Sequence, residues 1–358
     1  MMTSKERVQA ALAHIQPDFA PCDYFFTPEI HQALLTHFGV THEDDVRERL
    51  GTDIRYINPP YIGPALPQFD DGSTMNIWGI RKKPMPNEYG DYAEPINFPY
   101  AKWTTLEEAE AFPWPNPDWY DYSSIPALCD QYPEYCLATG SFSVQDFING
   151  VAFGRGVEQT LIDIAQRDPV YLYIVEKRHQ FYMEVTERSL QAAKGRIDLV
   201  LCGDDFGTQR DLLISPRTFD RLFAPKKQEF FEMVHSYGAK ISHHCCGSSA
   251  KLIPRFIQIG MDALQTIQPQ AAGMNPYQLK EQFGSQITLH GAVDVQGWLQ
   301  AATPTEIERE ILRLMEVVGA GGGFILSPCH NLQPDTPLEN VLAMYRAVAR
   351  YRGKTPQF

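Results

Sequence analysis

Residues 241–249 read ISHHCCGSS and place two histidines beside two cysteines, in a chain with only ten His and seven Cys. Side chains two positions apart on a strand point to the same face. His244 and Cys246 therefore form one convergent pair. His243 and Cys245 form another on the opposite face. Zinc prefers imidazole and thiolate ligands, and a catalytic zinc uses about three protein ligands and keeps one position open. The segment therefore favours a metal site completed from elsewhere in the chain.

The missing ligands are expected at the ends of other predicted strands. Cys329 and His330, in SPCHNLQPDTP, are the obvious source. Asp204 and Asp205, in GDDFG, are a reserve. Polar residues also follow other apolar runs, at Gln268 and His290. In a TIM barrel the active site forms at the carboxyl ends of the strands, so this clustering favours a barrel with a site at its mouth.

The elements that position these residues alternate from about residue 134 onward. Short apolar runs read YCLATGSFS, IDLVLCGDDFG, AKISHHCCG, MDALQTIQP, ITLHGAV and GGFILSPCH. Amphipathic stretches such as PVYLYIVEKRHQFYMEVTERSLQAAKG lie between them. This alternation predicts βα units with a parallel sheet, and APCDYFF is expected to supply the first strand. An open doubly wound sheet is the alternative, but the glycine-rich phosphate turn of a dinucleotide site is missing.

We therefore predict an α/β fold: a TIM (β/α)8 barrel with an N-terminal helical extension and a Pro/aromatic-rich insertion. Residues 1–358 are expected to form one domain. Residues 1–125 hold the N-terminal helices, the first strand and a loop-rich rim, and residues 126–358 hold the regular βα units. The stretch from 56 to about 125, with segments such as YINPPYIGP, is predicted to be irregular but well packed, because its aromatics supply burial.

The overall composition narrows the function classes. The net charge of −13 argues against nucleic-acid binding, which relies on clustered Lys and Arg. The start, MMTSKERVQAALAH, is charged rather than apolar and does not resemble a signal peptide, and no apolar run reaches the roughly 18 residues of a membrane span. An odd number of cysteines without an export signal indicates reduced thiols. We expect a cytoplasmic protein without membrane or nucleic-acid partners.

The sequence resembles the uroporphyrinogen decarboxylase superfamily, most strongly from Gly154 to the C-terminus. The segments that bear the resemblance are GRGVEQTLID, GDDFGTQRDLLISP, HHCCGSSAKLIPRFIQIGMDALQTIQPQAAGM, LHGAVDVQ and SPCHNLQPDTPLENV. The resemblance implies a TIM barrel with N-terminal helical additions. Its decarboxylases hold a tetrapyrrole polycarboxylate with an arginine-rich run after the first strand. The corresponding PCDYFFTPE contains no arginine.

A second branch, the zinc methyltransferases that exchange methyl groups with a corrinoid protein, matches better. Its His-x-Cys-Gly segment aligns with residues 244–247 and selects His244 and Cys246 as ligands. The alignment places His330 at the third-ligand position, with Cys329 as the alternative. The resemblance thus implies a corrinoid-dependent methyltransferase that binds Zn²⁺. This chain lacks the Asp-x-His-x-x-Gly segment of corrinoid-binding proteins. Methylcobalamin or a related corrinoid is therefore expected on a partner protein.

The other candidates receive supporting roles, and two further functions stay open. The catalytic candidates are Asp204, Asp205 and His290, and the substrate-binding candidates are Tyr24, Gln209 and Gln268. Either aspartate could be a general acid or base, a fourth ligand, or a partner that orients His244. A small-molecule methyl donor or acceptor is the expected substrate. The alternatives are a decarboxylase acting on a tetrapyrrole carboxylate and a non-catalytic binder of a tetrapyrrole or corrinoid.

Overall fold

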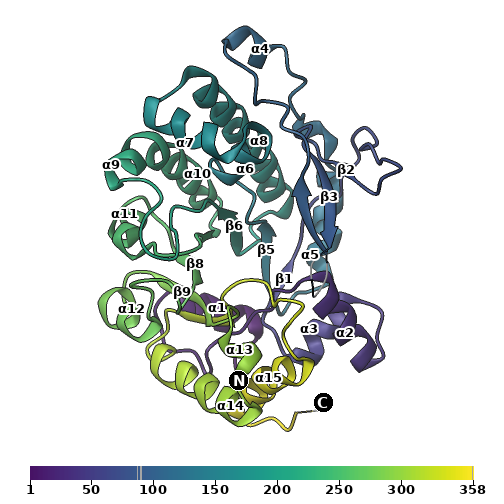
Figure 1. Cartoon of the computed structure of the whole chain (residues 1–358). Coiled ribbons are helices and arrows are strands. Elements are labelled where there is room, and N and C mark those ends of the chain that lie inside the picture. Colours follow the sequence, from purple (N-terminus) through teal and green to yellow (C-terminus); the bar gives the residue numbers. More distant parts are fainter. Residues whose placement is uncertain (87, 89–90, 357) are drawn as a thin grey trace.

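The computed structural model describes residues 1–86, 88, 91–356 and 358. Its centre is a curled sheet of seven parallel strands, in the order β1-β5-β6-β7-β8-β9-β10 (Figure 1). These strands are β1 (Ile54–Tyr56), β5 (Cys136–Gly140), β6 (Leu199–Gly203), β7 (Lys240–His244), β8 (Ala263–Ile267), β9 (Thr288–Val293) and β10 (Phe324–Pro328). Six of them, β5 to β10, lie within the apolar runs that the sequence singles out.

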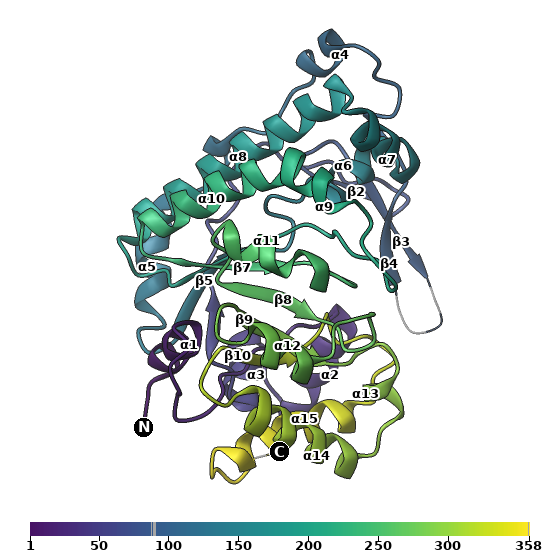
Figure 2. The ribbon, with the colours of Figure 1, turned by 90° about the vertical axis from the view of Figure 1, so that its left-hand side faces the viewer.

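Helices surround the outside of this sheet (Figures 1 and 2). They are α1 (Ser4–Leu12), α2 (Pro28–Phe38), α3 (Glu43–Leu50), α4 (Leu106–Glu110), α5 (Ile125–Asp130), α6 (Asn149–Arg155), α7 (Val157–Gln166), α8 (Pro169–Ala193), α9 (Pro216–Thr218), α10 (Ala224–Ser236), α11 (Ile253–Gln258), α12 (Pro276–Phe283), α13 (Trp298–Ala301), α14 (Pro304–Arg313) and α15 (Leu338–Tyr351). Each parallel connection from β5 onward crosses through helices, as βα units require.

Within the described part of the chain no eighth continuous strand closes the sheet into a barrel, so that part of the prediction is wrong. The segment APCDYFF lies between β10 and β1, where the eighth strand would stand. It contacts β10 through an isolated parallel bridge between Cys22 and Leu326. On the other side Asp53 N donates to Cys22 O at 2.9 Å, but Cys22 N donates to the Asp53 carboxylate. The Asp53 side chain therefore accepts the hydrogen bond that a backbone carbonyl would accept in a continuous strand pair. The short strand β1 was not foreseen.

Apolar side chains fill the interior of the curled sheet toward the amino-terminal ends of its strands. Leu199 and Leu201 of β6 and Ile325 of β10 are buried with Val8 and Leu12 of α1 in one hydrophobic cluster. Helix α1 contacts β1, β5 and β10 and closes the amino-terminal end of the sheet. Because the lower interior is filled, the free space lies at the carboxyl ends of the strands, the position of active sites in this class of fold.

The Pro/aromatic-rich insertion holds more regular structure than expected. It contains a three-stranded antiparallel sheet of β2 (Thr74–Met75), β3 (Arg81–Pro86) and β4 (Asp91–Pro95). The prediction of irregular structure is wrong there, because proline at a strand edge does not prevent pairing. Positions 87, 89 and 90 of this stretch lie outside the described residues. Close packing of the aromatics is confirmed: Tyr100 is fully buried against Trp103 and Phe112.

Figure 2 shows β3 and β4 on the side of the molecule toward which the β7 and β8 arrows point, so the insertion borders the mouth of the sheet. Among the described residues, no helix is both long enough and apolar enough to cross a membrane.

Candidate metal centre

Strand β7 places its two histidines on opposite faces. His243 points outward, where it is buried among the rings of Phe206 and Phe256. His244 points inward, because it shares a face with Ser242, whose hydroxyl lies 3.4 Å from His290 Nδ1 of β9 inside the sheet. Neither ring nitrogen of His243 has a hydrogen-bond partner among the described residues, which suits a packing role. Because side chains alternate between the two faces of a strand, His244 takes the inner position.

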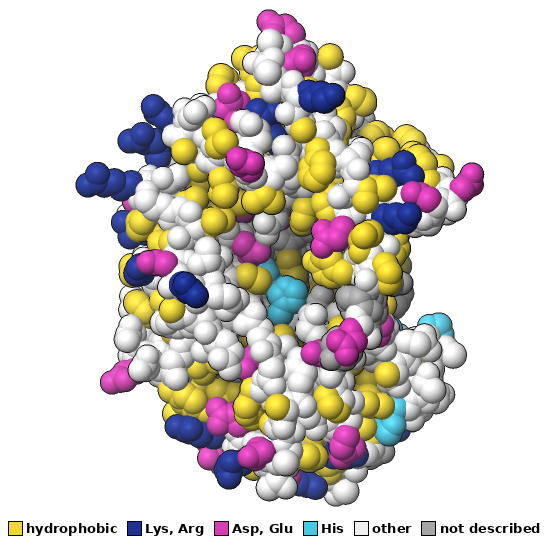
Figure 3. Space-filling view, in the orientation of Figure 1, with side chains coloured by type: hydrophobic (Ala, Val, Ile, Leu, Met, Phe, Trp, Pro, Cys, Tyr) yellow, Lys and Arg dark blue, Asp and Glu magenta, His cyan; other side chains and the backbone are white. Residues whose placement is uncertain are grey.

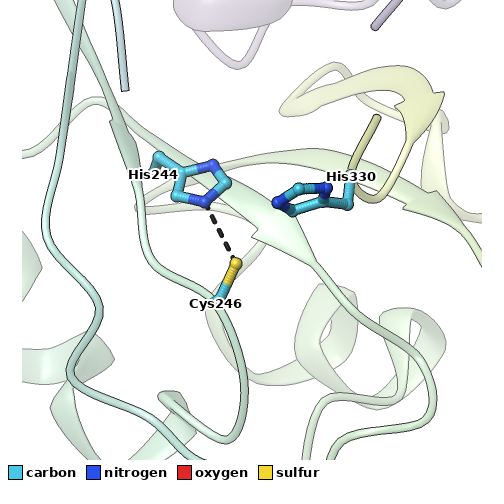
Figure 4. Close-up of side chains that lie close together, drawn as sticks. All are labelled: His244, Cys246 and His330. Atoms are coloured by element: carbon cyan, nitrogen blue, oxygen red, sulfur yellow. Dashed lines mark hydrogen bonds between the residues drawn. The ribbon is translucent and has the colours of Figure 1, made fainter. Parts of the chain in front are cut away.

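Three potential ligand atoms meet at the end of β7. One each from His244, Cys246 and His330 lies within 4.8 Å of the others (Figure 4). His244 Nε2 is 3.0 Å from Cys246 Sγ. A tetrahedral zinc, with bonds of about 2.0–2.3 Å, holds its ligand atoms roughly 3.5 Å apart. Small side-chain rotations thus suffice for the three donors to enclose one ion, and the donor set fits zinc.

Gln265 of β8 sets the orientation of the His244 ring. The two residues are register partners in adjacent strands, and His244 Nδ1 hydrogen-bonds to Gln265 Oε1. An amide oxygen only accepts, so Nδ1 must donate the proton and Nε2 keeps its lone pair toward Cys246. On the far side the ring stacks on Phe142 at 4.4 Å. The sequence analysis did not single out Gln265. Its position in the predicted strand that follows the His244 strand could have indicated it.

The turn that presents Cys246 is held by backbone packing against the loop after β6. Gly247 has φ +78°, and a Cβ added there would lie 2.6 Å from the carbonyl oxygen of Thr208. A Cβ on Gly207 would lie 2.7 Å from the carbonyl oxygen of Cys246. The Gln268 side-chain oxygen accepts from Gly247 N. Only glycine at these two positions allows the loops to approach so closely.

The two aspartates after β6 have different surroundings. The fully buried Asp204 carboxylate accepts from Phe147 N and Ile148 N at 3.1 and 3.0 Å and lies 3.5 Å from Lys227 Nζ. It anchors the loop before α6 and faces away from the three donors. The Asp205 carboxylate is 26% exposed; its Oδ1 accepts from Cys246 N at 2.7 Å and lies 3.7 Å from His244 Nε2. Asp205 is therefore the aspartate that borders the three donors.

Burial controls the protonation of the three donors. Burial, and then the neighbouring His244, lower the pKa of His330 to about 4. Burial likewise lowers the pKa of His244. For the Cys246 thiol, burial and then the Asp205 carboxylate raise the pKa. Both imidazoles therefore offer neutral nitrogen, whereas the thiol needs a bound cation to favour its thiolate.

The family model for uroporphyrinogen decarboxylase (URO-D) matches residues 176–351, the range that contains all three donors. This part of the chain is therefore similar to the URO-D family. Among solved structures, a methyltransferase from Methanosarcina mazei aligns over 98% of this chain and 99% of its own, with 16% identity and a TM-score of 0.63. This likeness concerns the fold. The IOLI protein with a bound zinc atom covers 66% of this chain and 84% of its own, with 12% identity and a TM-score of 0.37, from which we infer nothing. No curated protein sequence matches the chain.

The other predicted residues are spread around the carboxyl ends of the strands. His290 is fully buried, with Nε2 3.7 Å from the Asp23 carboxylate below the three donors. Gln209 is exposed on the loop after β6. Cys329 is fully buried and is not part of the three-donor cluster. Tyr24 is fully buried in the wall of a cavity that Phe142 and Asn331 also line. Figure 3 shows histidine side chains in a hollow on this face.

An arginine of α3 lies against the aromatic residues of PCDYFFTPE, although the segment itself contains no arginine. Arg47 of α3 is 4% exposed and places its guanidinium over the rings of Tyr24 and Phe26, with Cζ 5.4 and 5.8 Å from their centroids. Its charge is paired with Asp23 at 3.3 Å and with Glu43 at 2.7 Å. Sequence reasoning missed Arg47 because it comes from a different helix.

Proposed function

We propose that this protein is a zinc-dependent methyltransferase that exchanges a methyl group between a small molecule and the corrinoid of a partner protein. The observation that carries the proposal is the meeting of His244, Cys246 and His330 at the mouth of a URO-D fold. Three protein ligands leave one position for substrate, as in catalytic zinc sites. The fold of the Methanosarcina mazei methyltransferase supports the assignment at the level of architecture.

Bound zinc would supply a Lewis acid that polarises a methyl-bearing heteroatom, or lowers the pKa of an acceptor thiol. A set of two imidazoles and one thiolate carries a single anionic ligand, which favours activation of an oxygen- or nitrogen-linked methyl group. The protein's own groups prepare the site. Gln265 orients His244, and the turn at Gly247 presents Cys246. Asp205, 3.7 Å from His244 Nε2, can exchange a proton with the leaving or entering heteroatom.

A decarboxylase function fits the site less well. A cavity lined by Phe142, which stacks on His244, and by Asn331, which follows His330, measures ≈ 220 Å³. This is below the roughly 300–1,000 Å³ of pockets for drug-sized ligands. Among the described residues that line it, Arg47 is the only Lys or Arg, and its charge is already paired with two carboxylates. A tetrapyrrole with many carboxylates needs both volume and several free cations.

The deciding experiment is the metal content of the purified protein by elemental mass spectrometry. We expect about one zinc per chain in the wild type and in Cys329→Ala, since that thiol lies outside the cluster. We expect no stoichiometric zinc in the His244→Ala, Cys246→Ala double variant. The zinc-loaded protein should also convert cob(I)alamin to methylcobalamin with a methyl donor, followed by absorbance. A wild type that takes up no zinc when reduced and supplied with it refutes the proposal.

A further inference from the structure

A cavity of ≈ 250 Å³ lies at the carboxyl ends of β1 and β5. Ala138 of β5 faces the sheet interior, so Thr139 beside it faces outward, and the cavity lies between this outer side and α8. The Pro/aromatic-rich insertion supplies the remaining wall. None of His244, Cys246 and His330 lines the cavity. It is therefore separate from the candidate metal centre.

One face of α8 forms the longest wall of this cavity. The lining residues from α8 recur at the spacing of one side of a helix: Phe181, Tyr182, Val185, Thr186 and Ser189. Ring contacts hold the insertion against this face, since Phe181 lies 5.2 Å from Trp78 and 6.3 Å from Tyr120 between ring centroids. The cavity thus lies between elements that are packed on each other.

Thr186 in this wall carries a hydroxyl without a protein partner. The residue is 4% exposed, and its Oγ1 makes no hydrogen bond with the described residues. A serine or threonine in a helix can donate its hydroxyl to the carbonyl oxygen four residues earlier. Ser189 on the same face does so, to Val185 O at 2.8 Å, but Thr186 does not. The Thr186 hydroxyl therefore remains available to a molecule in the cavity, and leaving it unpaired costs free energy.

Two further hydrogen-bond donors line the cavity. The Asn58 side-chain oxygen accepts from Thr139 Oγ1 at 3.2 Å and from Gly140 N at 2.8 Å. These bonds fix the orientation of the amide and leave the hydrogens of Nδ2 without an acceptor among the described residues. The Tyr120 hydroxyl also lacks a partner there, and burial raises its pKa to about 12, so it stays protonated and can donate. A ligand with an acceptor oxygen satisfies such donors.

The rest of the lining favours an uncharged ring. Among the described residues no charged side chain lines the cavity, and Ile77, Val144 and Phe181 are among its apolar members. A charged ligand would lose its hydration here without gaining a partner. A carbonyl oxygen accepts two hydrogen bonds and brings no donor that would itself need an acceptor. Since an engineered cavity of about 150 Å³ holds one benzene, ≈ 250 Å³ accepts one six-membered ring with small substituents.

We infer that this cavity is a second binding site, which takes a small uncharged ring compound that carries a carbonyl oxygen. The ring packs against the apolar side of the cavity, and the oxygen accepts hydrogen bonds from donors such as the Thr186 hydroxyl. The site does not require bound zinc and is independent of the proposed methyl transfer. Gly140 and Ser141, which line it, directly precede Phe142, whose ring stacks on His244. A bound ligand therefore contacts the segment that carries Phe142.

The test is a titration with 1-methyl-2-piperidone, followed by ligand-observed nuclear magnetic resonance, of the zinc-loaded protein and of protein stripped of metal. The cation 1-methylpiperidinium and the anion cyclohexanecarboxylate are the comparison ligands. We expect the carbonyl compound to bind saturably to both forms, and more tightly than either ion. Thr186→Val, which removes the hydroxyl and keeps the shape, should weaken binding roughly three- to tenfold. Ser189→Ala is the matched control and should bind normally, because that hydroxyl is already bonded to Val185 O.

The Ile77→Trp variant fills the cavity and tests the location of the ligand. It should weaken binding on the order of tenfold or more, with zinc content and circular dichroism unchanged. Ile162→Trp, an exposed change on α7 outside the lining, should bind normally. The inference is overturned by absence of saturable binding, by tighter binding of either ion, by wild-type affinity in a folded Ile77→Trp protein, or by equal affinity of Thr186→Val and Ser189→Ala. Binding to a protein that takes up no zinc would retain this site and reject the proposed methyl transfer, so the two failures can be told apart.

Discussion

Replacing Gln265 by methionine tests whether the neighbouring strand prepares the metal site. The Gln265 amide is 1% exposed; its oxygen binds His244 Nδ1, and its nitrogen has no partner among the described residues. Loss of a hydrogen-bonding partner behind a metal-bound histidine typically weakens metal affinity 10–100-fold. This corresponds to about 1.4–2.8 kcal/mol of binding free energy.

The effect on folding should be much smaller than the effect on zinc. Methionine has nearly the volume of glutamine, and the exchange also removes a buried amide nitrogen without a partner. We expect the free energy of unfolding of the metal-free protein to change by about 1 kcal/mol or less. Gln265→Glu keeps an oxygen acceptor for His244 Nδ1 and should retain more of the affinity than Gln265→Met.

Zinc affinity is measured by competition with a chromophoric chelator, and unfolding by urea titration of protein stripped of metal. Gln270→Met is the matched control, because Gln270 is exposed beyond the end of β8 and binds Asp294 at 2.7 Å rather than a metal ligand. The reasoning fails if Gln265→Met and Gln270→Met hold zinc equally well. It also fails if Gln265→Met loses zinc only because the protein no longer folds.

Three further predictions concern residues other than the three donors and Gln265. Asp204→Asn should lower the free energy of unfolding by about 3 kcal/mol in urea titrations, because it leaves the buried Lys227 without its carboxylate; an unchanged midpoint would contradict this. Gly207→Ala should reduce zinc affinity more than it reduces stability, because its Cβ would push on the Cys246 carbonyl; retained affinity would refute that packing role. Burial alone raises the pKa of Asp53, but two buried arginines outweigh it and hold the pKa below its usual value. Its contribution to stability should be complete above about pH 5 and decline as the pH falls toward 3, and an Asp53→Asn variant should lose less stability over that range in the same titrations.

The sequence was most informative where local patterns and long-range structure agree. The strands β5 to β10 are apolar runs bounded by helices, and each lies where alternation of the sequence places it. Helix α2 ends at Phe38, and Gly39 after it has a φ of +65°, the left-handed conformation that a glycine adopts beyond a helix C-terminus. Such features depend on residues within one element, so the chain itself specifies them.

The sequence was least informative where an element depends on distant residues. Strand β1 has three residues, too few to show an alternating pattern in the sequence. It is a strand because it pairs with β5. The segment at Cys22 fails to form a strand because the Asp53 carboxylate takes its amide hydrogen bond. The pairing of Arg47 with Asp23 joins residues 24 positions apart. No local pattern encodes these contacts, because each partner looks ordinary until the chain folds.

The sequence by itself determined the chemistry that is available: imidazole and thiolate at 244–246, a further histidine at 330, and the parallel strands that bring strand ends together. Only the tertiary structure decided how these groups are used. The orientation of β7 turned His244 toward the inside of the sheet. The register with β8 placed Gln265 in hydrogen-bond contact with the His244 ring. The physical reason is that side-chain direction within a strand is local, whereas which strand lies beside it depends on packing of the whole sheet.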